Sequence, residues 1–369
     1  MSLSVGIVGL PNVGKSTLFN ALLKKQQAYA ANFPFATIEP NIGVVPVPDE
    51  RLLQLSEVIK DSEKLDYLPP LVPATVEFVD IAGLIAGAHK GEGLGNKFLS
   101  HIRQVNAILH VVRGFTDPDI VKEGSVDPVS DFEVIKTELM MADYQTLEKQ
   151  KEVKGSADSF EKARWSAILK LKAAIEKGIP AREVELGEEE AKAARELTLL
   201  SMKPILVALN IDEDALREAD ELEQKHAEAF GLSANQVIAI SAKVESDLAG
   251  FTVEEQKDYL FDLGIKQSGL ERIIKKGFFT LGLITFLTAG EKEVKAWTIK
   301  KGSKAQNAAG EIHNDFVKNF IKADVIESDK FISANGWKNA RESGLVRSEG
   351  RDYIVKDGDV IEFRVGSGN

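Results

Sequence analysis

Several short apolar runs, separated by stretches with helical spacing, constrain how this chain can fold. The runs occupy residues 5–8, 76–79, 108–112, 205–209 and 237–240. Continuous apolar runs of this length are typical of parallel strands whose two faces are covered by helices. The pattern therefore predicts an α/β fold with a doubly wound sheet. Because ligands of such sheets bind beyond the carboxyl ends of the strands, the residues after each run are the first candidates for a site.

The first run is followed by a glycine-rich loop and then by a helical pattern that starts at Thr17. The loop reads Gly9-Leu10-Pro11-Asn12-Val13-Gly14-Lys15-Ser16. This spacing between a strand and a helix is typical of a P-loop, whose backbone N–H groups and helix N-terminus face phosphate oxygens. Lys15 is expected to reach the β- and γ-phosphates, and the Ser16 hydroxyl to ligate Mg²⁺. The predicted phosphate-binding residues are Asn12, Val13, Gly14, Lys15, Ser16 and Thr17.

A second phosphate element follows the run at residues 76–79 as Asp80-Ile81-Ala82-Gly83. In P-loop proteins an Asp at this place holds Mg²⁺ through a water, and the glycine N–H contacts the γ-phosphate. Thr37 lies between the two motifs, where a switch threonine would ligate Mg²⁺ only with the γ-phosphate present. The predicted metal-binding residues are therefore Ser16, Thr37 and Asp80, and Gly83 joins Lys15 in the predicted catalytic set.

The residue that activates water differs from the one in many GTPases. Those proteins place a Gln directly after Asp-x-x-Gly, whereas this chain has Leu84. The glycine-rich segment that follows carries His89, whose imidazole is suited to orient water or to act as a base near neutral pH. An ordinary surface histidine in a loop is the alternative, and the sequence does not separate the two.

The segment that would read the base follows the run at residues 205–209. GTPases read guanine with Asn-Lys-x-Asp, but here the segment is Asn210-Ile211-Asp212-Glu213. Ile211 still offers an apolar surface to a base, and Glu213 is longer than Asp and would crowd a close bidentate pair, which predicts a much reduced guanine preference. Asp212 is one residue short of the reading position and would compensate if it turned toward the base, so GTP stays open. The segment after the last run, Ser241-Ala242-Lys243, matches the remaining base-contacting loop, with Ser241 and Ala242 as its predicted base contacts.

Two further regions follow different patterns. Residues 129–200 show no strand pattern and have helical spacing, and Asp158 with Glu161 predicts a new helix start, hence an antiparallel helical hairpin. Its charged faces fit either solvated surface or a partner-binding arm. Residues 281–369 predict a small α+β domain, with strands around Trp297 and Val360 and a helix at residues 312–321. Lysines near Trp297 fit either RNA contact or a solvated loop. The predicted nucleotide domain is accordingly split into residues 1–128 and 201–280.

Composition narrows the class of protein. With 369 residues and 44% hydrophobic residues, the chain is expected to form more than one folded domain. A net charge of -11 argues against non-specific coating of nucleic acid, so any RNA contact should be local. The absence of cysteine, of an export signal and of a membrane-spanning apolar stretch favours the cytoplasm and no membrane partner.

Taken together, these motifs resemble those of the YchF subfamily of Obg-related proteins, the Obg-like ATPases. The resemblance covers nearly the whole chain and also rests on Asn32-Phe33-Pro34-Phe35-Ala36-Thr37-Ile38, Gly87-Ala88-His89-Lys90-Gly91, Phe286-Leu287-Thr288-Ala289-Gly290 and Ala296-Trp297-Thr298. It implies a P-loop GTPase-like domain interrupted by a helical coiled-coil arm, followed by a ubiquitin-like, β-grasp TGS domain at the C-terminus.

The resemblance also implies an activity. It implies Mg²⁺-dependent hydrolysis of ATP in preference to GTP, with Asn210, Ile211 and Glu213 on the adenine side and His89 in catalysis. Asn12 matches a position that coordinates K⁺ in some related enzymes, which implies potassium stimulation. The implied partner is the ribosome, through its large subunit or the 70S particle, with local RNA contact by the TGS domain and the arm and a role in translation or stress. A monomer is expected. A guanine-selective GTPase and a nucleotide-gated ribosome-binding module with negligible turnover stay open as alternatives.

Overall fold

The structure is a computed structural model that describes residues 3–32, 41–81, 94–116, 127–152 and 158–366. Its contacts divide the chain into two compact units, Met1–Val45 with Glu77–Leu281, and Pro46–Val76 with Gly282–Asn369. The sequence predicts residues 46–76 to be part of the nucleotide domain, but in the structure this segment belongs to the second unit. The strand at Leu71–Val72 pairs with a strand of the second unit. Arg51 also bonds Asp357 and Thr285 of that unit. The boundaries of the arm and of the TGS domain stay predictions.

The first unit is built on a six-stranded sheet with the order β2-β4-β1-β5-β6-β7. Its strands are β1 (Ser4–Val8), β2 (Ile42–Pro46), β4 (Thr75–Asp80), β5 (Ala107–Arg113), β6 (Ile205–Asn210) and β7 (Val237–Ile240). The pairs β1–β4, β1–β5, β5–β6 and β6–β7 are parallel. All five strands predicted from apolar runs are confirmed, whereas β2 was missed because its inward and outward residues alternate in burial.

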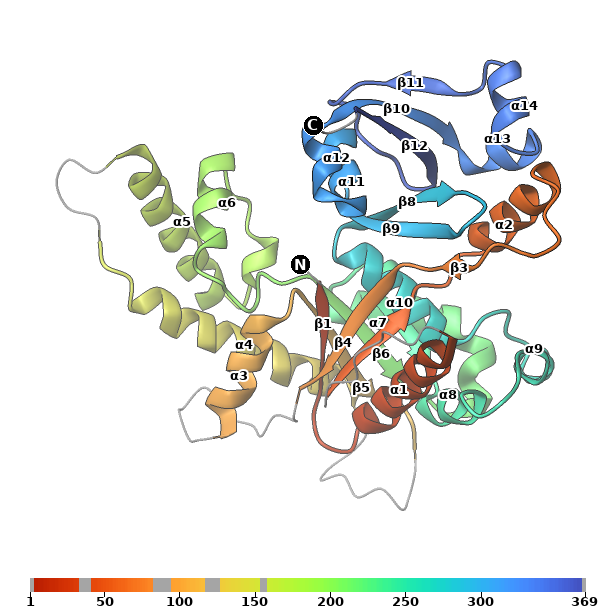
Figure 1. Cartoon of the computed structure of the whole chain (residues 1–369). Helices are drawn as coiled ribbons and strands as arrows, with labels where there is room; N and C mark the ends of the chain where they lie inside the picture. Colours follow the sequence, from red (N-terminus) through yellow and green to blue (C-terminus); the bar gives the residue numbers. More distant parts are fainter. Residues whose placement is uncertain (1–2, 33–40, 82–93, 117–126, 153–157, 367–369) are drawn as a thin grey trace. The chain divides into compact units, whose positions relative to one another are not determined.

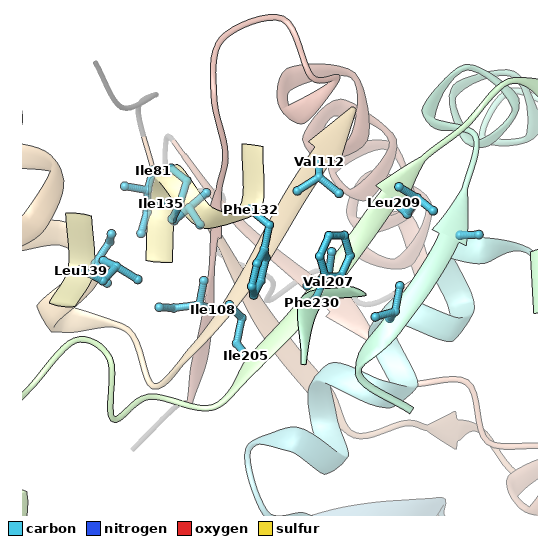
Figure 2. Packing of buried hydrophobic residues seen from close by; sticks show 14 of the residues in the cluster. Ile81, Ile108, Val112, Phe132, Ile135, Leu139, Ile205, Val207, Leu209 and Phe230 are labelled. Carbon is cyan, nitrogen blue, oxygen red and sulfur yellow. The ribbon is translucent and has the colours of Figure 1, made fainter. Parts of the chain in front are cut away.

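Helices cover both faces of this sheet, as Figure 1 shows. They are α1 (Lys15–Asn32), α3 (Leu94–Gln104), α4 (Pro128–Glu148), α7 (Ala219–Phe230), α8 (Ala242–Leu248), α9 (Val253–Asp262) and α10 (Gly269–Thr280), with 3-10 turns at Glu213–Glu218 and Ala234–Gln236. On one face, Phe132 of α4 stacks on Phe230 of α7 with ring centroids 4.7 Å apart (Figure 2). The predicted doubly wound α/β fold is confirmed.

Residues 129–200 were predicted to form an inserted helical hairpin. They contain the rest of α4, α5 (Ser159–Glu176), a 3-10 turn at Ala181–Glu183 and α6 (Glu188–Arg195), and α4 and α5 run antiparallel, since Tyr144 bonds Glu176 while Gln150 bonds Arg164. Asp158 caps α5 in a capping box with Glu161, as the sequence predicts. The first half of α4 nevertheless packs in the sheet core, and only its second half packs against α5.

The second unit has a six-stranded sheet with the order β11-β10-β12-β8-β9-β3. Its elements are α2 (Arg51–Ser62), β3 (Leu71–Val72), β8 (Leu283–Ala289), β9 (Val294–Lys300), α11 (Ala305–Ile312), α12 (Asn314–Lys318), β10 (Phe320–Glu327), α13 (Ser328–Ser333), α14 (Trp337–Glu342), β11 (Arg347–Glu349) and β12 (Asp359–Val365). The β8–β9 hairpin, the helix α11 and the parallel pairing of β12 with β8 make the β-grasp arrangement of ubiquitin-like domains.

The helix predicted at residues 312–321 is wrong in its bounds. It ends at Lys318, and it is divided at His313, whose φ of -160° and ψ of 139° are extended. Phe320 begins the strand β10 and contributes to the core of this unit, so tertiary packing overrides the helical spacing read from the sequence. No described helix of the chain has both the length and the apolar character needed to cross a membrane.

Candidate nucleotide site

A cavity of about 980 Å³ lies at the carboxyl edge of the first sheet, where β1, β5, β6 and β7 end. Its walls come from the P-loop and from the segments that follow these other strands. The lining residues are Asn12, Gly14, Lys15, Ser16, Thr17, Phe115, Thr116, Asn210, Ile211, Asp212, Glu213, Asp214, Ala215, Ser241, Ala242 and Lys243. The strands thus bring together residues more than two hundred positions apart in the sequence, at the edge where α/β sheets bind ligands.

The P-loop glycines are required by the backbone around them. A side chain at Gly9 would collide with the carbonyl oxygen of Val111 on β5. Gly14 has a φ of 95°, and a side chain there would collide with Nδ2 of Asn210. The loop can therefore curl against the sheet edge only with glycine at both positions, and α1 begins directly after it at Lys15.

The Lys15 ammonium lies inside the loop. Its side chain is largely buried, and its Nζ donates to the carbonyl oxygen of Leu10 at 2.6 Å. Burial lowers the pKa of Lys15 from its ordinary value, and the nearby Asp80 carboxylate opposes that shift. Burial in turn raises the pKa of Asp80, which Lys15 partly offsets. An ammonium and a carboxylate are thus close together at the end of β1 and β4.

Asn210, at the end of β6, joins the two ends of the cavity. It is 4% exposed, its Nδ2 donates to the carbonyl oxygen of Val13 at 3.0 Å, and its Oδ1 accepts from the N–H of Ala242 at 2.9 Å. One side chain therefore fixes the distance between the P-loop and the loop after β7. Both polar atoms of this amide have partners within the protein, which indicates a role in shaping the site.

The residues after Asn210 define the base end. Ile211 lines the cavity with an apolar side chain that is 4% exposed. Glu213 accepts a hydrogen bond at Oε1 from the Tyr259 hydroxyl of α9 at 3.2 Å. Asp212 accepts two hydrogen bonds at Oδ2 from Thr116, one from the backbone N–H at 3.0 Å and one from the hydroxyl at 3.1 Å. The two neighbouring carboxylates are thus bonded to different parts of the fold.

Phe115 forms a further wall that the sequence analysis did not predict. The guanidinium of Arg113 lies 4.4 Å from the centre of the Phe115 ring, and its Nε donates to the Phe115 carbonyl oxygen at 3.2 Å. Phe115 and Thr116 directly follow β5, so their place after a predicted strand was the signal that would have identified them. Asp214 and Ala215 also line the cavity and were absent from the predicted set, whereas Lys243 lies in the loop predicted to contact the base.

Most of the predicted site residues for which the structure gives a position line this cavity. Val13 does not line it, because its side chain is in the core and only its carbonyl oxygen meets Asn210. Asp80 is not part of the lining either, although it is close enough to Lys15 for their charges to interact. Thr37, Gly83 and His89 lie outside the described residues.

The described residues offer ligands of the kind that Mg²⁺ prefers. The exposed Ser16 side chain lines the cavity, and the half-buried Asp80 carboxylate lies near Lys15. Among the described residues there is no cluster of three His, Cys, Asp or Glu that would hold a metal alone. A hydroxyl and one carboxylate fit an ion that is held largely by phosphate oxygens and water, as in P-loop proteins.

Comparison with known proteins places these features in one family. A "Ribosome-binding ATPase YchF" from Bacillus subtilis is 47% identical over 371 residues, which cover 99% of both chains. A protein of the same name from Escherichia coli O157:H7 is 47% identical over 98% of this chain and 99% of its own. The chain belongs to the YchF family. This YchF protein is accordingly a P-loop nucleoside triphosphatase.

Two family models and a solved structure agree with this assignment. The model described as 50S ribosome-binding GTPase matches residues 4–150 of the YchF chain, and the model YchF-GTPase_C, described as a protein of unknown function, matches residues 283–366. The solved structure of the Schizosaccharomyces pombe YchF GTPase is similar with a TM-score of 0.85 and 36% identity, covering 98% of both chains. These relatives are named both as ATPases and as GTPases, and the residues of the pocket bear on the choice of base.

Proposed function

We propose that this chain is a Mg²⁺-dependent switch that hydrolyses ATP in preference to GTP and associates with ribosomes. The observation that carries the proposal is the base end of the cavity, where Ile211 and Glu213 stand in place of the Lys and Asp that read guanine. A site built for guanine offers two acceptor oxygens to its adjacent N–H donors. Without those two acceptors, the N–H donors of guanine are left without hydrogen-bond partners in the pocket. This lowers the affinity for GTP strongly.

The reaction we propose is in-line attack of water on the γ-phosphate. Lys15 and the P-loop N–H groups stabilise the charge that develops on the phosphate oxygens, while the Ser16 hydroxyl and Asp80 would hold the metal ion. When bound, Mg²⁺ neutralises phosphate charge and orients the β- and γ-phosphate oxygens. Thr37 and the Gly83 N–H would respond to the γ-phosphate, and His89 would orient the water in place of the missing Gln.

The partner we propose is the ribosome, through its large subunit or the 70S particle. The relatives named as ribosome-binding ATPases, and the family model described as a 50S ribosome-binding GTPase, support association with ribosomes. Local RNA contact through the C-terminal unit would use the lysines near Trp297, because the Trp297 ring itself is stacked on Phe286 and covered by the Lys295 ammonium at 3.7 Å. The helical arm at residues 129–200 would make a second contact with the ribosome. The protein would act as a monomer and would regulate translation or a stress response.

Potassium stimulation is part of the same proposal. Asn12 has a φ of 60° and its exposed side chain lines the cavity, in keeping with the position implied for a K⁺ ligand. Comparing phosphate release in KCl and in NaCl at the same ionic strength tests this part. Equal rates in the two salts would remove K⁺ from the mechanism.

The proposed activity is tested by measuring phosphate release from ATP and from GTP, with and without purified ribosomes, and by pelleting the chain with ribosomes. ATP should be the better substrate, and turnover without ribosomes should be slow.

In single-turnover assays, His89→Ala should lower hydrolysis about 100-fold while ATP affinity is kept. Full turnover in that variant would remove His89 from catalysis. Faster GTP hydrolysis, or no hydrolysis under any condition, would instead support one of the two alternative functions.

A further inference from the structure

We propose that Tyr259 and Thr116 are positioning residues that set the base preference of the pocket. Tyr259 holds one oxygen of Glu213, and Thr116 holds Asp212 away from the position that reads guanine. Glu213 then presents a single free carboxylate oxygen to the base. This inference rests on the proposed ATP preference and assigns the side chains that produce it.

Asp212 is placed where its side chain would ordinarily cap the turn that follows. It is the N-cap residue of the 3-10 turn Glu213–Glu218, yet its side chain makes no capping hydrogen bond. Its Oδ2 instead accepts from both the N–H and the hydroxyl of Thr116. The Asp212 carboxylate thus bonds Thr116 and leaves the N-terminus of its own turn uncapped. Thr116 therefore fixes the position of this carboxylate.

The segment that carries Thr116 is itself fixed against the base end. The N–H of Gly114 donates to the carbonyl oxygen of Asn210 at 2.7 Å, which continues the pairing of β5 with β6 beyond both strands. A side chain at Gly114 would lie only 3.1 Å from Cγ2 of Ile211. The backbone that leads to Thr116 is therefore held close to the segment that carries Asp212. The contact between the two residues follows from the pairing of β5 with β6.

Glu213 is held from the other side by α9. The Tyr259 ring meets Phe251 edge to face with centroids 5.5 Å apart, and Gln256 donates to the carbonyl oxygens of Leu248 and Phe251. Burial, followed by the hydrogen bond to Glu213, raises the pKa of Tyr259, so the phenol keeps its proton and serves as a donor. The hydroxyl is therefore carried by the side of α9 on which the partly buried Tyr259 and Leu260 pack against the core, and it donates to Oε1 of Glu213.

The two bases differ in the donors that they offer. Adenine presents one exocyclic amino group beside a ring nitrogen that accepts, whereas guanine presents a ring N–H and an amino group side by side. The Tyr259 hydroxyl occupies one side of Oε1 and fixes its direction, so Oε2 is the carboxylate oxygen that Glu213 can turn fully toward a donor of the base. That arrangement matches adenine and leaves one guanine donor without a partner, provided that Asp212 stays with Thr116.

Four variants test these roles by calorimetric titration with ATP and GTP. Tyr259→Phe frees Oε1 of Glu213. Thr116→Val removes the hydroxyl bond to Asp212 and keeps the backbone N–H bond, which loosens the carboxylate. In each variant the ratio of ATP to GTP affinity should fall about threefold. Thr116→Ser keeps the hydroxyl and should retain the wild-type ratio. In Thr116→Val combined with Asp212→Ala, the gain in GTP affinity should disappear, because it depends on the released carboxylate.

Tyr67→Phe and Thr146→Val remove a tyrosine and a threonine hydroxyl that do not line the pocket, and they serve as matched controls. If the two residues were merely structural, Tyr259→Phe and Thr116→Val would weaken ATP and GTP equally. An unchanged ratio in both variants would overturn the positioning roles while the ATP preference of the wild type stands. A wild-type preference for GTP would overturn the proposed function itself, and the inference with it, in the first titration.

Discussion

The phosphate end of the pocket is made from one continuous segment, whereas the base end is assembled from segments far apart in the sequence. Gly9, Gly14 and Lys15 act through local backbone geometry and one ammonium. The base end needs Thr116 after β5 and Tyr259 on α9 to fix the carboxylates of the segment after β6. The phosphate-binding groups therefore come from one local motif that packs against the strand ends, while the choice of base is set mainly by tertiary contacts.

The largest expected effect comes from removing the ammonium at the phosphate end. Lys15→Ala should weaken both ATP and GTP by about 100-fold or more, because a buried charge that pairs with phosphate is lost. Calorimetric titration measures this, and Lys24→Ala serves as a matched surface control, since the exposed Lys24 does not line the pocket and donates to the Ser246 carbonyl oxygen. Full nucleotide affinity in Lys15→Ala would mean that the pocket lies elsewhere.

The link between the two ends is tested at Gly14. Gly14→Ala should lower the free energy of unfolding by about 2–3 kcal/mol and also weaken nucleotide binding, because the new side chain meets a positive φ and the Asn210 amide. Gly178→Ala is the matched control, because Gly178 has a φ of 77° with no atom within 4 Å of the added carbon. It should cost about 1 kcal/mol and leave binding unchanged. Equal denaturation midpoints for the two variants would contradict the collision with Asn210.

The base end should respond to substitution without a change at the phosphate end. Ile211→Lys combined with Glu213→Asp restores the residue types that read guanine, and the ratio of ATP to GTP affinity should fall about tenfold. Affinity for inorganic triphosphate, measured in the same titrations, should stay at its wild-type value. If the ratio does not move, base selection does not depend on this segment.

The smallest effect is a pH dependence of binding. Burial lowers the pKa of Lys15 below 10.5, so the ammonium loses its proton as the pH rises through the lowered value. Because a triphosphate needs the charged form, affinity should be full near neutrality and should fall as the pH rises into the alkaline range, at a lower pH than an ordinary lysine would require. The slope should be absent in Lys15→Ala. A slope of the same size in that variant would assign the titration to another group.

The same contrast explains what the sequence predicted. The strands of the first sheet other than β2, the P-loop and the cap at Asp158 were predicted because each depends on a local pattern. The grouping of residues 46–76 with the second unit and the strand at Phe320 were not, because both depend on pairing with distant strands. The sequence also did not decide whether Asp212 turns toward the base. Its hydrogen-bond partner Thr116 is 96 positions away in the sequence, so no local pattern reveals the contact.

The central claim is that the pocket grips a triphosphate at Lys15 and no longer favours guanine. The most direct measurement is a paired calorimetric titration of the intact chain with ATP and with GTP, in the same buffer with Mg²⁺. ATP should bind at least about tenfold more tightly than GTP. Equal affinities, or tighter binding of GTP, would contradict the assignment of Ile211 and Glu213 to adenine.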